Sequence, residues 1–212
     1  AAGLSRYSAY DKAGRLIADV NHYGDMTEYR YDANDRIVST TRYATRLTAG
    51  QLAILQNPDS VFDVGAIRPG ASGADLWSWS VYDKLGQVVA SIAGDGSVAT
   101  MAYDKSGRLV GTTAYAVKLT AGQIAGFKTT PPLLTDIPAP TAADAITRSF
   151  YDRDGRLLGR LDGEGFLVRN VYDKAGNKVS EIASYNAVPA GLRAAGSFND
   201  LAASVGSSAG DR

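Results

Sequence analysis

The stretch Tyr10-Asp11-Lys12-Ala13-Gly14-Arg15 decides the fold of this chain, because its pattern recurs. The full motif Tyr-Asp-x-x-Gly-Arg returns at 103–108 and 151–156, and the Tyr-Asp pair alone returns at 31, 82 and 172. The tyrosines are 21 residues apart within each of three pairs, and gaps of 51 and 48 residues separate the pairs. A fixed period indicates a repeat architecture, in which no single unit carries a unique site.

The motif predicts a tight turn between two strands. An Asp at the first turn position can accept hydrogen bonds from the backbone N–H groups that follow it, and a Gly three residues later can adopt a positive φ. Gln87 and Asn177 replace the arginine in two copies, and Asn34-Asp35 replaces the glycine in one. The residues assigned to this structural motif are Tyr10, Asp11, Gly14, Arg15, Tyr31, Asp32, Tyr82, Asp83, Gly86, Tyr103, Asp104, Gly107, Arg108, Tyr151, Asp152, Gly155, Arg156, Tyr172, Asp173 and Gly176.

A second turn is expected midway between the two Tyr-Asp copies of each pair. Gly24, Gly96 and Gly165 each fall 14 residues after the preceding tyrosine. Turn signals therefore recur about every 10 residues, with β-rich runs such as 87–92 and 108–113 between them. This spacing predicts antiparallel hairpins, with four strands in a meander for each pair of motifs.

Tyr and Arg of one motif flank the same turn. We therefore expect the two side chains to be cross-strand neighbours, with the guanidinium stacked on the ring and the Asp carboxylate within its reach. Each such pair contributes about 0.2–1 kcal/mol, so only repetition makes the contribution large. A structural role is favoured over a catalytic one because the motif occurs six times.

One short helix and one connector are expected after each set of four strands. Thr48 and Thr120 each begin a Thr-x-x-Gln capping box, and Pro189 takes the equivalent place later in the chain. The Gly-, Pro-, Ser- and Ala-rich segments 57–73, 129–143 and 196–210 are then connectors. The chain divides into three repeat blocks, 1–72, 73–141 and 142–212, of one continuous array that is part of a longer protein.

Composition excludes several functions. Lys+Arg and Asp+Glu both number 22, so a nucleic-acid partner is not expected, and no run approaches the length of a membrane span. Without cysteine and with one histidine, His22, the chain lacks the residues for a disulfide, a catalytic triad or a multi-histidine metal site. The acidic pairs do not follow an EF-hand pattern. We expect no catalytic residues, no cofactor and no bound metal.

Trp77 and Trp79 alternate along one predicted strand and so share a face. Facing solvent, they could contact a ligand by stacking on sugar rings; otherwise they fill the core as strand aromatics do. Core packing is the expectation favoured here.

The chain resembles the YD-repeat (Rhs) family through Tyr-Asp-x-x-Gly-Arg at 21-residue spacing with a glycine 14 residues after each leading tyrosine. The resemblance covers roughly residues 5–43, 77–115 and 146–185. It implies long strips of β-hairpins, as in bacterial Rhs toxins, the shells of Tc toxins and teneurins, with no catalysis by the repeats themselves. The chain departs from a continuous strip in the segment of about 50 residues after each pair, which is expected to break a hairpin spiral.

The first hypothesis for function is a structural repeat segment of a large secreted or cell-surface bacterial protein that builds an extended or filamentous β scaffold. Its partners would be neighbouring repeat blocks, paired through strand edges, or the same protein end to end. A toxin-encapsulating shell is the first alternative, and an adhesin or glycan-binding module is the second. An enzyme is not expected.

Overall fold

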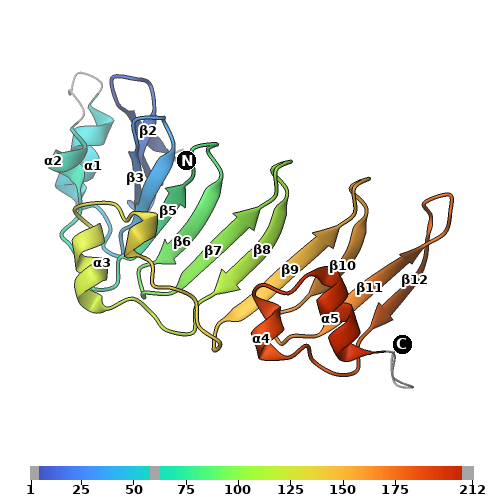
Figure 1. The fold of residues 1–212 in the computed structure, drawn as a ribbon. Coiled ribbons are helices and arrows are strands. Elements are labelled where there is room, and N and C mark those ends of the chain that lie inside the picture. Colours follow the sequence, from blue (N-terminus) through green and yellow to red (C-terminus); the bar gives the residue numbers. More distant parts are fainter. Residues whose placement is uncertain (1–4, 58–62, 207–212) are drawn as a thin grey trace. The chain divides into compact units, whose positions relative to one another are not determined.

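In a computed structural model of the chain, residues 5–57 and 63–206 are described. Twelve strands within these ranges form antiparallel pairs in sequence order, from β1 to β12 (Figure 1). The predicted fold, mainly β with tandem antiparallel hairpins, is confirmed. The strands are β1 (Tyr7–Tyr10), β2 (Leu16–Val20), β3 (Met26–Tyr31), β4 (Ile37–Arg42), β5 (Leu76–Tyr82), β6 (Val88–Ala93), β7 (Val98–Tyr103), β8 (Leu109–Ala114), β9 (Ala145–Tyr151), β10 (Leu157–Leu161), β11 (Leu167–Tyr172) and β12 (Lys178–Ala183).

The segments between pairs of motifs do not break the strip of hairpins, so this expectation was wrong. Strand β4 pairs directly with β5, with Thr40 opposite Ser78, and β8 pairs with β9, with Thr112 opposite Thr147. The intervening residues leave the sheet after one strand and return to its free edge. A returning strand needs only the free edge of the sheet to form its hydrogen bonds. A long connection therefore separates two strands in the sequence without interrupting the hydrogen bonding of the sheet.

Two helices begin at the predicted capping boxes. In α1 (Ala49–Gln56) the Thr48 hydroxyl accepts from the Gln51 N–H and the Gln51 side chain accepts from the Thr48 N–H, and α3 (Ala121–Phe127) repeats this with Thr120. Helix α4 (Ala190–Arg193) follows Pro189 without a side-chain cap. A 3₁₀ turn, η1 (Leu134–Asp136), lies in the second connector.

Two expected connectors contain additional helices, so one helix in each block was too few. Helix α2 (Val64–Ile67) begins after Asp63, whose carboxylate accepts from the Gly65 N–H. Helix α5 (Phe198–Val205) begins at Ser197, which forms a capping box with Asp200. These caps were hidden in a Gly-, Ser- and Ala-rich composition. The parts of the expected connectors at 58–62 and 207–210 lie outside the described residues.

The described residues group into two compact units. The first comprises residues 5–57, 63–86, 91–96 and 120–134, and the second comprises residues 87–90, 97–119 and 135–206. Strand β6 is divided between them. The division into three repeat blocks stays a prediction.

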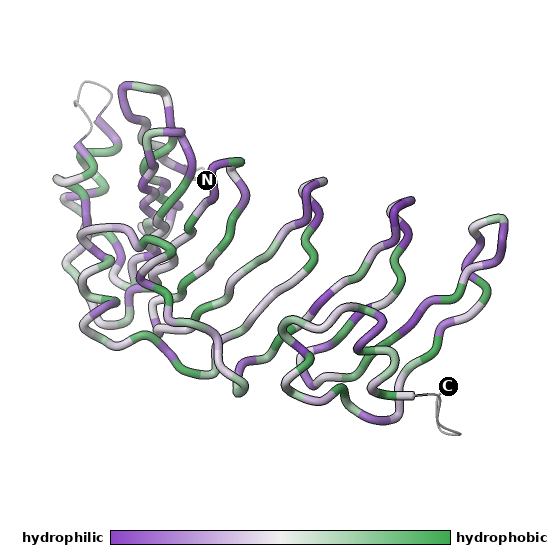
Figure 2. The backbone as a smooth tube through the Cα atoms, in the orientation of Figure 1, coloured by the Kyte–Doolittle hydropathy of each residue, from purple (hydrophilic) through white to green (hydrophobic). Residues whose placement is uncertain are grey.

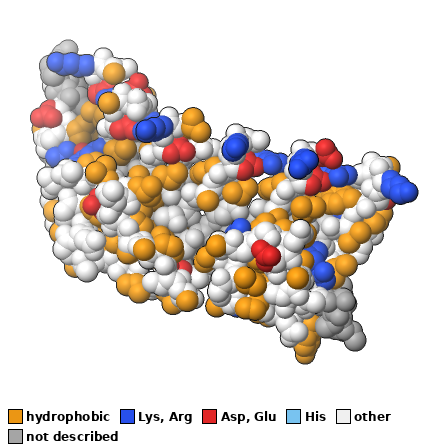
Figure 3. Space-filling view, in the orientation of Figure 1, with side chains coloured by type: hydrophobic (Ala, Val, Ile, Leu, Met, Phe, Trp, Pro, Cys, Tyr) orange, Lys and Arg blue, Asp and Glu red, His pale blue; other side chains and the backbone are white. Residues whose placement is uncertain are grey.

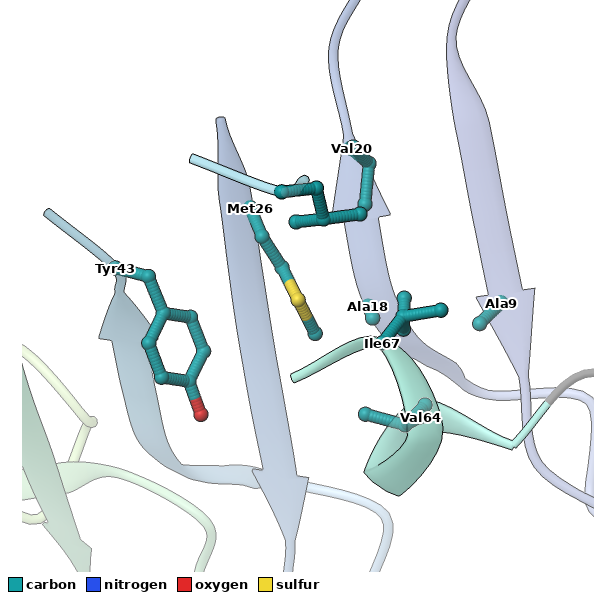
Figure 4. Close-up of a cluster of buried hydrophobic side chains, with 8 residues drawn as sticks. Ala9, Ala18, Val20, Met26, Tyr43, Val64 and Ile67 are labelled. Atoms are coloured by element: carbon teal, nitrogen blue, oxygen red, sulfur yellow. The ribbon is translucent and has the colours of Figure 1, made fainter. Parts of the chain in front are cut away.

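Each unit has a hydrophobic core between its strands and helices. In the first unit, Ile67 of α2 packs with Ala18, Val20 and Met26 of β2 and β3 (Figure 4). In the second, Leu161 and Leu167 pack with Leu201 and Val205 of α5. Several hairpin tips are hydrophilic, whereas hydrophobic and hydrophilic residues are interspersed along the strands (Figure 2).

An engineered disulfide tests the pairing of β4 with β5 in a chain that has no cysteine of its own. Residues that face each other in an antiparallel pair have Cα atoms about 4.5–5.5 Å apart, within the range of a disulfide. We expect Thr40→Cys/Ser78→Cys to oxidise to an intramolecular disulfide, because these residues are opposite. The control Thr40→Cys/Leu76→Cys is displaced by two residues and should stay reduced. Equal thiol titration of both variants after mild oxidation would contradict the register.

Candidate functional site: the repeated turns and their contacts

The Asp of each motif organises the turn. The Asp11 Oδ1 accepts from the backbone N–H groups of Ala13 and Arg15, at 2.9 and 3.0 Å. Its backbone carbonyl accepts from Gly14, whose φ is +80°. A carboxylate can satisfy several N–H groups that the turn leaves without strand partners. The backbone N–H two residues further along likewise donates to the carboxylate of Asp32, Asp83, Asp104, Asp152 and Asp173.

Positive φ is needed at the fifth position of the motif. Gly86, Gly107, Gly155 and Gly176 have φ between +77° and +86°. Asp35 takes this place in the second copy with φ +62°, and Asp is among the residues that tolerate the left-handed region best. Its carboxylate also pairs with Arg15 Nη1 at 2.7 Å.

The arginine at the end of the motif pairs with the Asp of its own turn. Arg15 Nε donates to Asp11 Oδ2 at 2.7 Å, and Arg36, Arg108 and Arg156 make the same ion pair with Asp32, Asp104 and Asp152. Where Asn177 replaces the arginine, its Nδ2 donates to Asp173 Oδ2 at 3.0 Å. Charged side chains accordingly gather at the hairpin tips (Figure 3).

These hydrogen bonds lower the pKa of the turn carboxyls. For Asp11 and Asp104 the largest cause is the backbone N–H of the following arginine, assisted by its guanidinium. The pKa of Asp32 and Asp173 is lowered first by the side chains of Arg36 and Asn177. At Asp152 burial, which raises the pKa, is the largest single cause, yet the hydrogen bonds from Arg156 together leave the pKa below its ordinary value.

The arginine stacks on the tyrosine of the next motif and not, as expected, on that of its own. The Cζ atom of Arg15 lies 4.9 Å from the centre of the Tyr31 ring, and Arg36 lies 4.6 Å from Tyr82. The same contact joins Arg108 to Tyr151 and Arg156 to Tyr172, at 4.2 and 5.4 Å. Tyr10 pairs with Leu16 across its hairpin, which leaves Arg15 inside the turn and directed toward the following hairpin.

The tyrosine hydroxyl makes a second contact between consecutive motifs. Tyr31 donates to the carbonyl of Leu16 at 2.7 Å, and Tyr82 donates to that of Ile37 at 2.9 Å. Tyr103 and Tyr172 make the equivalent bonds to Val88 and Leu157. We call this series of arginine and tyrosine contacts the Arg–Tyr ladder. Arg36 extends it across the first connector, donating to the carbonyl of Asp83, 47 residues further along the chain.

Gln87 replaces the arginine in the third copy of the motif, as Asn177 does in the sixth. Its Nε2 donates to the carbonyl of Gly107 at 3.3 Å, so a hydrogen bond replaces the stacking contact. Tyr10 begins the described series and is 61% exposed.

The second set of turns joins the sheet to the segments that precede the helices. Gly24, Gly96 and Gly165 have φ of +83°, +86° and +97°. The carbonyls of Gly24 and Gly165 accept from the N–H groups of Leu47 and Val188. His22 lies in the first of these turns, and the centre of its ring is 3.6 Å from the centre of the Tyr23 ring.

Trp77 and Trp79 share a face of β5, and their rings stack at 5.7 Å. Trp79 is 1% exposed, and its Nε1 donates to the carbonyl of Phe127 in α3. Trp77 is half-buried, with Arg30 and Lys128 over its ring at 5.7 and 5.6 Å. Trp79 is therefore a core residue, and any ligand contact would fall to Trp77.

An ionic cluster around a buried carboxylate in the first unit was missed by sequence reasoning. Glu28 is 6% exposed and accepts two hydrogen bonds from Arg68, at 2.8 and 2.7 Å, and one from Tyr43 at 2.6 Å. Burial alone would raise the pKa of Glu28, but these bonds hold it below its ordinary value. Burial and the neighbouring carboxylate raise the pKa of Tyr43. Glu28 and Arg68 are 40 positions apart in the sequence, so no local pattern indicated that they would pair.

A second missed feature is an Asp that ends each described connector. Asp75 accepts from the N–H groups of Ala44 and Ser72, and Asp144 accepts from those of Ala116 and Thr141. The clamp closes each connector just before the strand that returns to the sheet. The pattern Ser/Thr-x-x-Asp at 72–75 and 141–144 is a sequence signal from which these clamps could have been predicted.

Within the described residues, no helix has the length and apolar character needed to cross a membrane. The same residues contain no group of three or more His, Cys, Asp or Glu side chains arranged to hold a metal ion.

Comparison with known proteins finds one repeat family in two segments of the chain. The RHS Repeat family profile matches residues 10–48 and 82–116, which contain four of the six Tyr-Asp motifs. These two segments carry RHS repeats. The resemblance to YD-repeat proteins inferred from the motif is therefore confirmed. No curated protein matches the sequence.

Solved structures support the fold of these RHS repeats. The chain is similar to TcdB2-TccC3 without its hypervariable C-terminal region, with a TM-score of 0.50 and 14% identity over 84% of this chain and 8% of that one. At this identity the likeness concerns the fold alone. The Tc holotoxin pore of Photorhabdus luminescens also matches, at 14% identity over 84% of this chain and 10% of that one, but its TM-score of 0.35 carries no argument. The RHS repeats here span less than a tenth of the length of the first structure.

Replacing one arginine of the ladder should destabilise the chain. Arg36→Gln removes the ion pair with Asp32, the hydrogen bond to the Asp83 carbonyl and the stacking on Tyr82. We expect a loss of about 1–2 kcal/mol in the free energy of unfolding, measured with urea. The control Arg153→Gln changes an exposed arginine inside a turn and should stay within about 0.5 kcal/mol of the parent. Equal losses for both variants would contradict the ladder.

Stability should fall in acid because of the turn carboxyls. Their pKa is lower in the folded state than the unfolded value of about 3.9, so their contribution is complete well above pH 4 and is lost as the pH falls through the folded-state pKa. We expect the urea midpoint to be constant from pH 7 to about 5 and to drop below about pH 4. Asp104→Asn should flatten that drop, whereas Glu164→Gln, at an exposed position, should leave the profile unchanged. Parallel profiles for the parent chain and Asp104→Asn would contradict this assignment.

Proposed function

We propose that the chain is a wall segment of an Rhs/Tc-like shell and has no catalytic role. The supporting observation is that strand pairing passes both connectors, at β4–β5 and at β8–β9. A shell needs a sheet that continues over many hairpins, and these pairings remove the objection that the connectors would interrupt it. An open filamentous scaffold is the second candidate, since the same continuity could serve an extended strip.

The repeated contacts fit a load-bearing role better than a reactive one. The arginines and carboxylates of the motifs are engaged with each other and with backbone groups, and the same arrangement recurs from turn to turn. Structural ion-pair networks shift pKa values as reaction sites do, so the lowered pKa of the turn carboxyls does not by itself mark a reaction site. The parent protein would be a large secreted or cell-surface bacterial protein, with neighbouring repeats as the partners of this segment.

A glycan-binding module is the less favoured hypothesis. The hypothesis assigned the ligand contact to Trp77, Trp79 or the connectors, and Trp79 is 1% exposed. Stacking on a sugar also requires a free ring face, and Trp77 has Trp79 beside it and two cations over its ring.

Electron microscopy of the intact parent protein tests the shell. We expect closed hollow particles. Thr112→Pro, which removes a backbone N–H within β8 between two paired strands, should open them. The control Ala139→Pro lies between Pro138 and Pro140 in a connector and should leave the particles closed. Filaments from the parent protein would favour the extended scaffold, and compact solid particles would contradict both candidates.

A further inference from the structure

The sheet has two equivalent places where a returning strand joins the preceding one. We call the β4–β5 pair the first junction and the β8–β9 pair the second junction. Ser39 faces Trp79 in the first, and Gly111 faces Arg148 in the second. One step further along, Thr41 faces Trp77 and Thr113 faces Ile146. The register is the same, so the side chains at the two junctions can be compared position by position.

The first junction is filled by the chain itself. Trp79, Ser39 and Thr41 are 1%, 2% and 3% exposed. Phe127 of α3 meets the Trp79 ring edge-on at 5.9 Å, and its carbonyl accepts from Trp79 Nε1 at 3.1 Å. Two indole rings and the end of a helix therefore cover the strands.

At the second junction Arg148 takes the place of Trp79. Its Nη1 donates to the carbonyls of Arg193 and Gly196, at 3.1 and 2.7 Å, as Trp79 donates to Phe127 at the end of α3. The helix is thus held in the same way. Ile146 stands where Trp77 would be, so neither large ring is present.

A hollow results at the second junction. Gly111 and Thr113 are only partly buried there, in contrast to Ser39 and Thr41 at the first junction. The hollow has a volume of about 320 Å³, and its lining residues include Thr100, Ala102, Gly111, Thr113, Ile146 and Phe150. This is the lower end of the usual size for ligand pockets, roughly 300–1,000 Å³.

We propose that this hollow binds an aromatic side chain presented by a partner polypeptide. The first junction shows the kind of occupant that this geometry accommodates, since indole rings occupy it there. Charge complementarity points the same way. Arg148 lines the hollow beside Phe150, 4.6 Å from its ring, and makes no ion pair with a carboxylate among the described residues. A guanidinium in this setting attracts the electron-rich face of a second ring.

The hydroxyl groups in the lining add selectivity. Thr100 and Thr113 provide acceptors for an indole N–H, whereas an aliphatic side chain would leave them without a partner when it displaced water. A tryptophan side chain is therefore the best match.

Binding of N-acetyl-tryptophanamide to the full chain tests the site by NMR. We expect saturable shifts centred on Gly111, Thr113 and Ala194, and at least fivefold weaker binding of N-acetyl-leucinamide. Ile146→Trp/Arg148→Trp, which installs the residues of the first junction, should abolish the shifts. Ala102→Phe adds a ring to the lining of the hollow without changing Arg148 and should do the same if the double variant fails to fold.

A matched control keeps the hollow and adds a ring elsewhere. Val179→Trp lies on β12, where the side chain is 61% exposed, and should bind the probe as the parent chain does. The proposal is overturned if the probe does not bind, if its shifts centre on other residues, if the leucine probe binds equally well, or if Ala102→Phe retains binding. None of these outcomes depends on whether the parent protein forms a shell.

Discussion

The carboxylate of the Tyr-Asp pair is the group on which the rest of the structure depends. It accepts backbone N–H groups within the turn and pairs with the arginine that ends the motif. Because that ion pair orients the guanidinium, the arginine reaches the tyrosine of the next hairpin. The carboxylate that satisfies the backbone N–H groups of one turn thus also positions the arginine that contacts the next turn.

Each contact in this series is weak, and repetition makes it effective. A stacked guanidinium at an exposed site contributes about 0.5–1 kcal/mol, and the net stability of a domain is only about 5–15 kcal/mol. Four arginine–tyrosine contacts in the described chain are therefore a substantial share. The hydrophobic clusters under the helices pack against one face of the strands. The Arg–Tyr ladder therefore stabilises the strands at the hairpin tips, and the hydrophobic core stabilises them where the helices cover the sheet.

Local features could be predicted from the sequence, and contacts between distant residues could not. The turn glycines and the capping boxes at Thr48 and Thr120 depend on residues within five positions of each other, so their patterns are complete in the sequence. The partner of Arg36 lies in another hairpin beyond a connector, and nothing near Arg36 identifies it. The Glu28–Arg68 pair was missed for the same reason, and α5 was missed because a composition typical of a linker concealed its cap at Ser197.

The clamps formed by Asp75 and Asp144 make the register of the returning strand independent of the length of the connector. Each clamp ties the residue that leaves the sheet to the residue that returns, so the distance between the ends of the connector is fixed locally. The two described connectors differ in length and helix content, yet β5 and β9 return in the same register. Such connectors are natural places for insertions to accumulate during evolution, including whole domains, without altering the sheet from which they project.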